Sequence, residues 1–407
     1  MRSPFLRAVS LFAAILLAAG TRAAFAQDEL FVTNGGGDTV TVYTRTANGN
    51  IAPLRTISGG ATGLSTPRGM ALDTVNNELA VANSLSPPSI TVYALTANGN
   101  VAPLRTISGA ATGLTVNTVG LAVDTVNNEF FVAIGASLGP SVLVFSRTAN
   151  GNVAPLRTIS GAATGLISPY GVAVDIVNNE VAVTNLSGNS VTVYSRTANG
   201  NVAPLRTISG AATGLNGPLG LAVDTVNNEL VAATSGGNSV SVYARTANGN
   251  VAPLRTISGA ATGVSGPVGV AVDTVNNELA VVNLNTSVTV YTRTANGNVA
   301  PLRTLQGAAT GLNIPLFVGI TTGGAPPTAT PTSPPGTPTP TPTSPPATPT
   351  PTPTSPPATP TPTSPPVPTS TPLPGGVVVP TLDVRGQITL TLILAAIGIL
   401  AIRRLNS

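Results

Sequence analysis

The segment Thr246–Thr256, TANGNVAPLRT, decides the fold, because near-copies of it recur along the 407-residue chain. Each period between copies holds short apolar alternations separated by Gly and Asn turns, without a helical pattern. A period of about 50 residues built in this way is the size of one four-stranded propeller blade. The sequence therefore predicts an all-β, six-bladed β-propeller. The six copies begin at Thr46, Thr96, Thr148, Thr197, Thr246 and Thr294.

Four strands per period are expected, and in the second period they cover residues 69–73, 78–83, 89–93 and 103–108, called strands A to D. A Gly opens strand A in five periods, which suits the innermost strand, where neighbouring blades crowd the axis. A Pro opens strand D, as on an outer edge strand. We expect the Arg of each PLRT to face solvent and protect that edge, with an anion-binding ring as the alternative. These are Arg55, Arg105, Arg157, Arg206, Arg255 and Arg303.

The two ends of the repeat region complement each other. The first period supplies strands B, C and D only, whereas residues 317–321 form a lone strand A. Pairing this strand with the first blade would close the ring without unpaired ends. Phe317 stands where other periods have Gly, and Thr321 where they have Asp. We expect Phe317 to fill the channel mouth, which argues against an open active site.

Composition restricts the chemistry. The chain lacks Cys, His, Trp and Lys, which excludes disulfides, imidazole ligands and His-based catalysis. The formal net charge is +4, but residues 27–324 hold 12 Arg and 13 acidic residues. Because the positive surplus lies in the terminal segments, no nucleic-acid partner is expected.

The chain ends predict targeting segments. Arg2 and Arg7, an apolar run and Ala24-Phe25-Ala26 are typical of a signal peptide over residues 1–26. The propeller is assigned to residues 27–324, and a Pro/Thr-rich disordered stalk to 325–376. Residues 377–407 hold a short motif, an apolar stretch expected to be a hydrophobic helix, and two arginines. They predict a sorting signal or a permanent transmembrane anchor, with the propeller outside the cytoplasm.

Two resemblances follow from these residues. Pro-x-Gly-(V/L)-A-V-D, with Phe31-Val-Thr-Asn34 and Val183-Thr-Asn185, resembles NHL and YVTN-type propeller repeats of exported and cell-surface proteins. That resemblance implies a propeller that acts as a lactonase, a scaffold or a ligand-binding module. The arrangement after Val379-Pro-Thr-Leu382 resembles the IPTL-type sorting signals of Gram-negative bacteria, which implies an exosortase-like processing partner.

Three repeated side-chain sets have structural explanations. The Asp-x-Val-Asn-Asn-Glu motif could hold calcium, but repetition at the A–B turn favours turn chemistry, so no metal or cofactor is expected. The Asn residues ending strand B are expected to cap loops rather than to offer ligands: Asn34, Asn83, Asn185 and Asn283. The strand C aromatics are expected to pack between blades rather than to stack on bases: Tyr43, Tyr93, Phe145, Tyr194, Tyr243 and Tyr291.

The B–C and D–A loops differ between periods and share one face of a propeller. Beside the channel on that face, only Arg68 and Tyr170 interrupt an otherwise aliphatic set. These two residues are the candidate ligand-binding residues, and no catalytic residue is assigned. The sequence predicts a non-enzymatic binding, adhesion or scaffold module whose partner is an extracellular or envelope protein or glycan. The alternative is a metal-dependent hydrolase of lactonase or esterase type, acting in the channel.

Overall fold

The computed structural model describes residues 28–85, 87–135 and 139–322. The predicted signal peptide, stalk and C-terminal sorting segment, with its expected hydrophobic helix, lie outside the described residues. In these three ranges, no helix has the length and apolar character that a membrane span requires.

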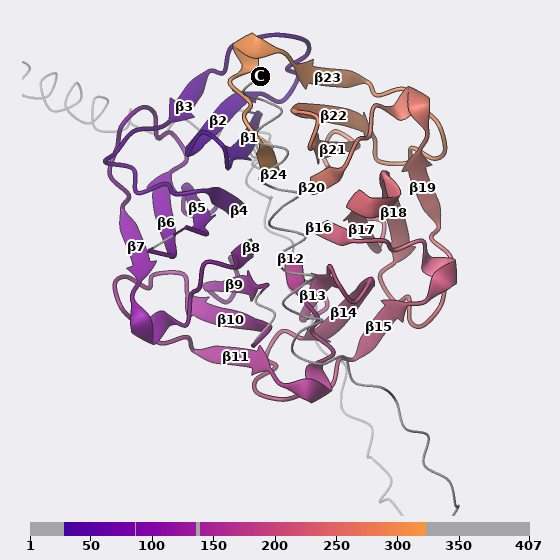
Figure 1. Ribbon diagram of the computed structural model, residues 1–407, viewed down its shortest axis with the longest axis horizontal. Coiled ribbons are helices and arrows are strands. Elements are labelled where there is room, and N and C mark those ends of the chain that lie inside the picture. Colours follow the sequence, from indigo (N-terminus) through magenta and orange to yellow (C-terminus); the bar gives the residue numbers. More distant parts are fainter. Residues whose placement is uncertain (1–27, 86, 136–138, 323–407) are drawn as a thin grey trace, which may run out of the picture. The chain divides into compact units, whose positions relative to one another are not determined.

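Six four-stranded antiparallel sheets surround a central axis and confirm the six-bladed propeller (Figure 1). Strand A of each blade is innermost: β4 (Pro67–Asp73), β8 (Thr118–Asp124), β12 (Pro169–Asp175), β16 (Pro218–Asp224), β20 (Pro267–Asp273) and β24 (Pro315–Thr321). Strand B follows: β1 (Glu29–Asn34), β5 (Glu78–Asn83), β9 (Glu129–Ile134), β13 (Glu180–Asn185), β17 (Glu229–Thr234) and β21 (Glu278–Asn283).

The outer half of each blade contains strands C and D. Strand C is β2 (Thr39–Thr44), β6 (Ser89–Ala94), β10 (Ser141–Ser146), β14 (Ser190–Ser195), β18 (Ser239–Ala244) or β22 (Ser287–Thr292). Strand D is β3 (Arg55–Ile57), β7 (Arg105–Ser108), β11 (Arg157–Ser160), β15 (Arg206–Ser209), β19 (Arg255–Ser258) or β23 (Arg303–Gln306). Short 3-10 turns are η1 (Ala110–Thr112), η2 (Ala162–Thr164), η3 (Ala211–Thr213), η4 (Ser235–Gly237), η5 (Ala260–Thr262) and η6 (Ala308–Thr310).

The predicted ring closure is confirmed. Strand β24 pairs antiparallel with β1, and Val318 lies opposite Val32. The first blade is therefore the sheet β24-β1-β2-β3, which joins both ends of the repeat region. The Glu29 N–H donates to Thr321 Oγ1 at 3.2 Å. Thr321 thus contributes to the closure from the position where other blades have Asp.

The glycines of strand A are needed for close approach between blades. A Cβ atom on Gly69 would lie 2.3 Å from the Val119 carbonyl oxygen, and one on Gly120 would lie 2.2 Å from that of Tyr170. Such distances are far inside van der Waals contact, so any side chain would push the neighbouring strand A away. The predicted reason for Gly at this position is confirmed.

The outer edge differs from the prediction. Strand D starts at the Arg rather than at the Pro, and its edge is not free. The TANGN segment of the next blade covers it: Gly99 N–H donates to Thr56 O at 2.7 Å, and Ser58 N–H donates to Gly99 O at 3.1 Å. Asn98 Oδ1 accepts the Thr56 N–H. All six segments pair in this way, and the first closes the ring a second time, by pairing Gly49 with Leu305 of the last blade.

The expectation that the strand D arginines face solvent is wrong, and so is the anion-binding ring. Arg105 forms a two-pronged ion pair with Glu78 of its own blade, both contacts at 2.7 Å. Arg147 of the next blade also binds Glu78, at 2.8 Å. A partly buried guanidinium is stable only with a charged partner, and carboxylates already fill this role here. These arginines are therefore not free to bind another anion. The corresponding strand D pairs are Arg55–Glu29, Arg157–Glu129, Arg206–Glu180, Arg255–Glu229 and Arg303–Glu278.

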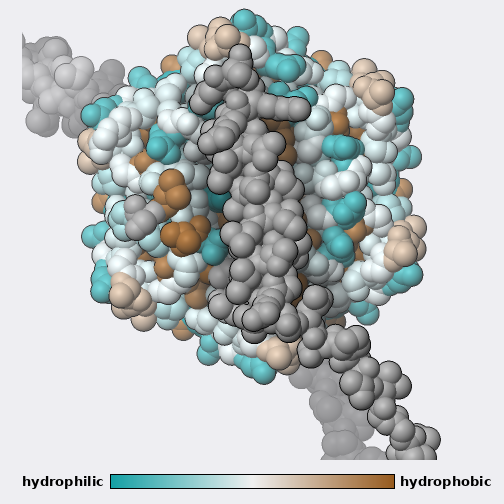
Figure 2. Space-filling view, viewed as in Figure 1, coloured by the Kyte–Doolittle hydropathy of each residue, from teal (hydrophilic) through white to brown (hydrophobic). Residues whose placement is uncertain are grey.

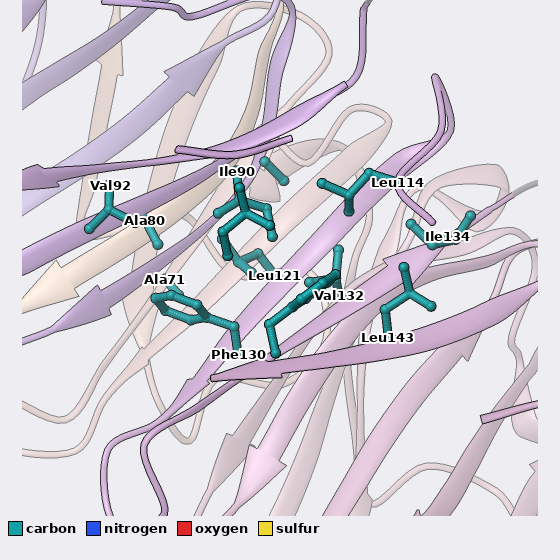
Figure 3. Close-up of a cluster of buried hydrophobic side chains, with 13 residues drawn as sticks. Ala71, Ala80, Ile90, Val92, Leu114, Leu121, Phe130, Val132, Ile134 and Leu143 are labelled. Carbon is teal, nitrogen blue, oxygen red and sulfur yellow. The ribbon is translucent and has the colours of Figure 1, made fainter. Parts of the chain in front are cut away.

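The hydrophobic core lies between neighbouring blades. Figure 3 shows one such layer, in which Ile90 and Val92 of the second blade meet Leu121 and Phe130 of the third. Tyr93 packs between the first two blades, and its hydroxyl donates to the Thr62 carbonyl. The prediction that strand C aromatics serve blade packing is confirmed.

Candidate functional site

The two faces of the ring use different connections. We call the side with the B–C and D–A connections the loop face, and the side with the A–B and C–D connections the turn face. On the turn face, Asp73 Oδ1 accepts the N–H groups of Val75 and Asn76 at 3.1 and 2.9 Å. Turn chemistry is confirmed for the Asp of the repeated motif, whereas its Glu belongs to the ion pairs. In the described ranges, no acidic cluster of three or more is placed to hold a metal.

Buried amides organise the loop face. Asn83 is fully buried at the end of β5. Its Nδ2 donates to Thr91 Oγ1 at 3.0 Å, and its Oδ1 accepts the Ser65 N–H at 3.1 Å. The side chain therefore fastens the D–A connection to the blade, as the loop-capping prediction requires. Asn34, Asn185 and Asn283 accept equivalent N–H groups from Asn313, Ile167 and Ser265.

Side chains from the starts of the A strands gather at the channel on the loop face. The rings of Tyr170 and Phe317 stack with their centroids 5.9 Å apart and 9° between their planes. Their strands, β12 and β24, lie on opposite sides of the axis (Figure 1). The expectation that Phe317 fills the mouth is thus met by a stacked pair. We call the following residues the mouth cluster: Arg68, Tyr170, Leu219, Val268, Leu316 and Phe317.

Two threonine hydroxyls fix the backbone beneath the aromatic pair. Thr33 Oγ1 accepts the Phe317 N–H at 3.1 Å and donates to the Arg68 carbonyl at 2.7 Å. Thr184 Oγ1 accepts the Gly171 N–H at 2.8 Å and donates to the Leu219 carbonyl at 2.5 Å. The other four blades have Ala82, Ala133, Ala233 and Val282 at this place in strand B.

Sequence reasoning missed these threonines. The sequence does mark them, because only the first and fourth blades have a hydroxyl where the other blades have an aliphatic side chain at this position of strand B. These are the blades that supply the aromatic pair.

Arg68 differs from the other arginines of the described ranges. Each of the others forms an ion pair with an aspartate or glutamate, whereas Arg68 has no carboxylate partner within these ranges. Its side chain is half-buried, and its Nε donates to Ser84 Oγ at 3.0 Å. Ser84 in turn donates to the Thr66 carbonyl. The guanidinium is therefore oriented by the B–C loop without being neutralised.

The structure brings the two predicted site residues together. Burial raises the pKa of Tyr170 above its ordinary value, and the positive charge of Arg68 and a hydrogen bond with it oppose this rise in part. Tyr170 is consequently a neutral phenol at physiological pH. It can donate a hydrogen bond beside a fixed positive charge.

Exposed aliphatic side chains lie in the loop-face connections. Leu85, Val116, Ile167, Leu284 and Ile314 are each at least half exposed. None of them belongs to a segment that repeats in every blade. Figure 2 shows brown hydrophobic residues scattered among pale and teal ones on one face of the ring. Among the described residues, the loop face thus combines a single cation, an aromatic pair and separate apolar side chains.

Comparison with known proteins supports the fold alone. No protein-family model and no curated protein matches the sequence. The structure is similar to a chain of the nidogen/laminin complex, with 15% sequence identity and a TM-score of 0.51, over 72% of this chain and 97% of that one.

Two further similar structures have TM-scores below 0.5. A functionally unknown protein from Desulfotomaculum acetoxidans has 14% identity and a TM-score of 0.49, over 73% of this chain and 99% of that one. The WD40 propeller domain of Doa1 has 12% identity and a TM-score of 0.47, over 70% of this chain and 81% of that one.

Proposed function

We propose that the protein is an exported β-propeller of the cell envelope that acts as a non-enzymatic binding, adhesion or scaffold module through its loop face. One observation carries the proposal: the departures from the repeat gather on this face. The turn face repeats its Asp-capped turns in five blades and its strand D ion pairs in all six. The loop face instead holds Arg68, which has no carboxylate partner among the described residues, the Tyr170–Phe317 pair and variable aliphatic side chains. A β-propeller is consistent with such a module.

The chemistry of the mouth cluster fits recognition better than hydrolysis. Its titratable side chains are Arg68 and Tyr170, and the other members are apolar. The amide oxygens of the buried Asn residues nearby already accept backbone N–H groups. A metal-dependent lactonase or esterase would need carboxylates or free amides around this mouth. No observation on the described residues favours that alternative.

Export and attachment are proposed from sequence. Residues 1–26 have the pattern of a signal peptide, and residues 377–407 that of a sorting signal or anchor. The NHL/YVTN repeat type and the IPTL-type signal belong to the same proposal. Residues 325–376, rich in Pro and Thr, would hold the propeller away from the membrane as a semi-rigid spacer.

Binding of the tagged full chain to isolated cell envelopes tests the loop face. The test variant combines Leu284→Ser with Ile314→Ser, and the control combines Val75→Ser with Val275→Ser on the turn face. All four side chains are at least half exposed, so neither variant should unfold the protein. We expect the loop-face variant to lose at least about tenfold in affinity and the control to match the wild type. Equal losses in both variants, or no loss in either, would contradict the proposal.

A further inference from the structure

We propose that the mouth cluster binds a single carboxylate carried on an apolar body. This inference rests on the proposed function, because it names the ligand chemistry for the same face. It is based on side chains that differ from the repeat and that lie together at the channel mouth although they come from different blades. They are Arg68 in the second blade, Tyr170 in the fourth and Phe317 in the first, with Thr33 and Thr184 fixing the backbone beneath them. Blade packing does not need these departures, since the remaining blades close the same contacts with Gly and aliphatic residues.

The charge of the site sets the charge of the ligand. Arg68 contributes one positive charge, and every other arginine of the described ranges is already paired with a carboxylate. A guanidinium group matches the geometry of a carboxylate, because two parallel N–H groups can bind both oxygens. Ser84 holds Nε and the Tyr170 hydroxyl accepts a further N–H, which leaves the other terminal N–H groups of Arg68 for a ligand. A phosphate dianion would keep one of its two charges without a cation, because Arg68 is the only cation in the described part of the mouth.

The side chains around Arg68 indicate the chemistry of the ligand beyond its carboxylate. Leu219, Val268 and Leu316 are buried and form an apolar floor. Tyr170, Leu186 and Phe317 pack on that floor and are only partly buried, so part of their apolar surface borders solvent. A ligand with an acyl or aryl body would cover this surface and gain from its burial. The Tyr170 hydroxyl lies beside Arg68 and can donate a hydrogen bond to the same carboxylate.

Titration calorimetry of the full chain with naphthoate and with neutral naphthamide tests this assignment. We expect naphthoate to bind with a stoichiometry of one and more tightly than the amide. Arg68→Met should weaken naphthoate at least about tenfold and leave naphthamide within about twofold, since only the charge-assisted bonds are lost. Tyr170→Phe keeps the stacked ring and should weaken naphthoate several-fold. Val275→Ser, at an exposed position on the turn face, is the matched control and should leave both affinities unchanged.

The outcomes separate this inference from the proposed function. Equal weakening of acid and amide by Arg68→Met, or no binding of naphthoate to the wild type, would overturn the carboxylate assignment. The proposed function would survive that result if the loop-face serine variant still lost binding to envelopes. Binding of naphthoate as expected, with envelope binding unaffected by the loop-face variant, would leave the mouth site standing and overturn the envelope role.

Discussion

At the scale of single residues, the tyrosines report how tightly the blades pack. Burial raises the pKa of Tyr43, Tyr93, Tyr194 and Tyr243 to about 12, although a neighbouring hydroxyl opposes the rise in each case. Burial also raises the pKa of the remaining two, Tyr170 and Tyr291. The pKa of every tyrosine in the described residues is therefore raised above the ordinary value.

A spectrophotometric titration checks this prediction. The folded protein should show almost no phenolate absorbance at pH 10, whereas the protein in denaturant should titrate near the ordinary value of about 10. Because the folded pKa lies above the unfolded one, the neutral phenols contribute stability fully below pH 10. That contribution is lost as the pH rises toward 12, so the free energy of unfolding should fall across this window. Phenolate absorbance at pH 10 in the folded protein would show that the blade interfaces are looser than described.

The functional residues could be predicted only in part. Arg68 and Tyr170 stood out in the sequence because they interrupt an aliphatic set, and the structure places them together. Thr33 and Thr184 were missed because their partners lie on neighbouring strands and blades. A repeat sequence shows which positions vary, but only the fold shows which variable positions meet.

At the scale of elements, strand A tolerates no side chain at its Gly position in the five blades that have a Gly there. Gly120→Ala would place a Cβ atom 2.2 Å from the Tyr170 carbonyl oxygen of the next blade. Since a backbone atom cannot rotate away, we expect a loss of about 3 kcal/mol in the free energy of unfolding. Urea denaturation measures this loss.

Gly60 provides the matched control. A Cβ atom there would meet nothing within 4 Å, and Ala110 and its equivalents occupy the same position in the other copies. Gly60→Ala should be neutral or stabilising by about 0.5 kcal/mol. Similar midpoints for the Gly120 and Gly60 variants would refute the close approach of the A strands.

The elements also show why some sequence predictions failed. The strand positions followed from Gly and Asn turns, which are local signals. The TANGN segment pairs with a neighbouring blade, and the PLRT arginine pairs with a Glu that lies two strands away in its own blade. A single repeat shows strand D as a free edge. The hydrogen bonds that cover this edge come from the next repeat, and the carboxylate that binds the arginine comes from strand B.

At the scale of the whole molecule, the number of strands determines the closure. A first period lacking strand A and a final strand A without B, C and D predicted one shared blade, and the sheet β24-β1-β2-β3 confirms it. The same closure brings Phe317 into the mouth opposite Tyr170. The candidate site therefore depends on the ring being closed between its two ends.

A disulfide test measures this closure most directly, because the chain has no cysteine of its own. Val32 and Val318 are paired across β1 and β24, and paired residues of antiparallel strands have Cα separations that a disulfide spans. The double variant Val32→Cys with Val318→Cys should oxidise to one intramolecular disulfide, seen as a linked peptide by mass spectrometry. Pairing Val32→Cys with Val223→Cys of another blade should leave both thiols free. Free thiols in the first variant, or links only between molecules, would contradict the closed ring.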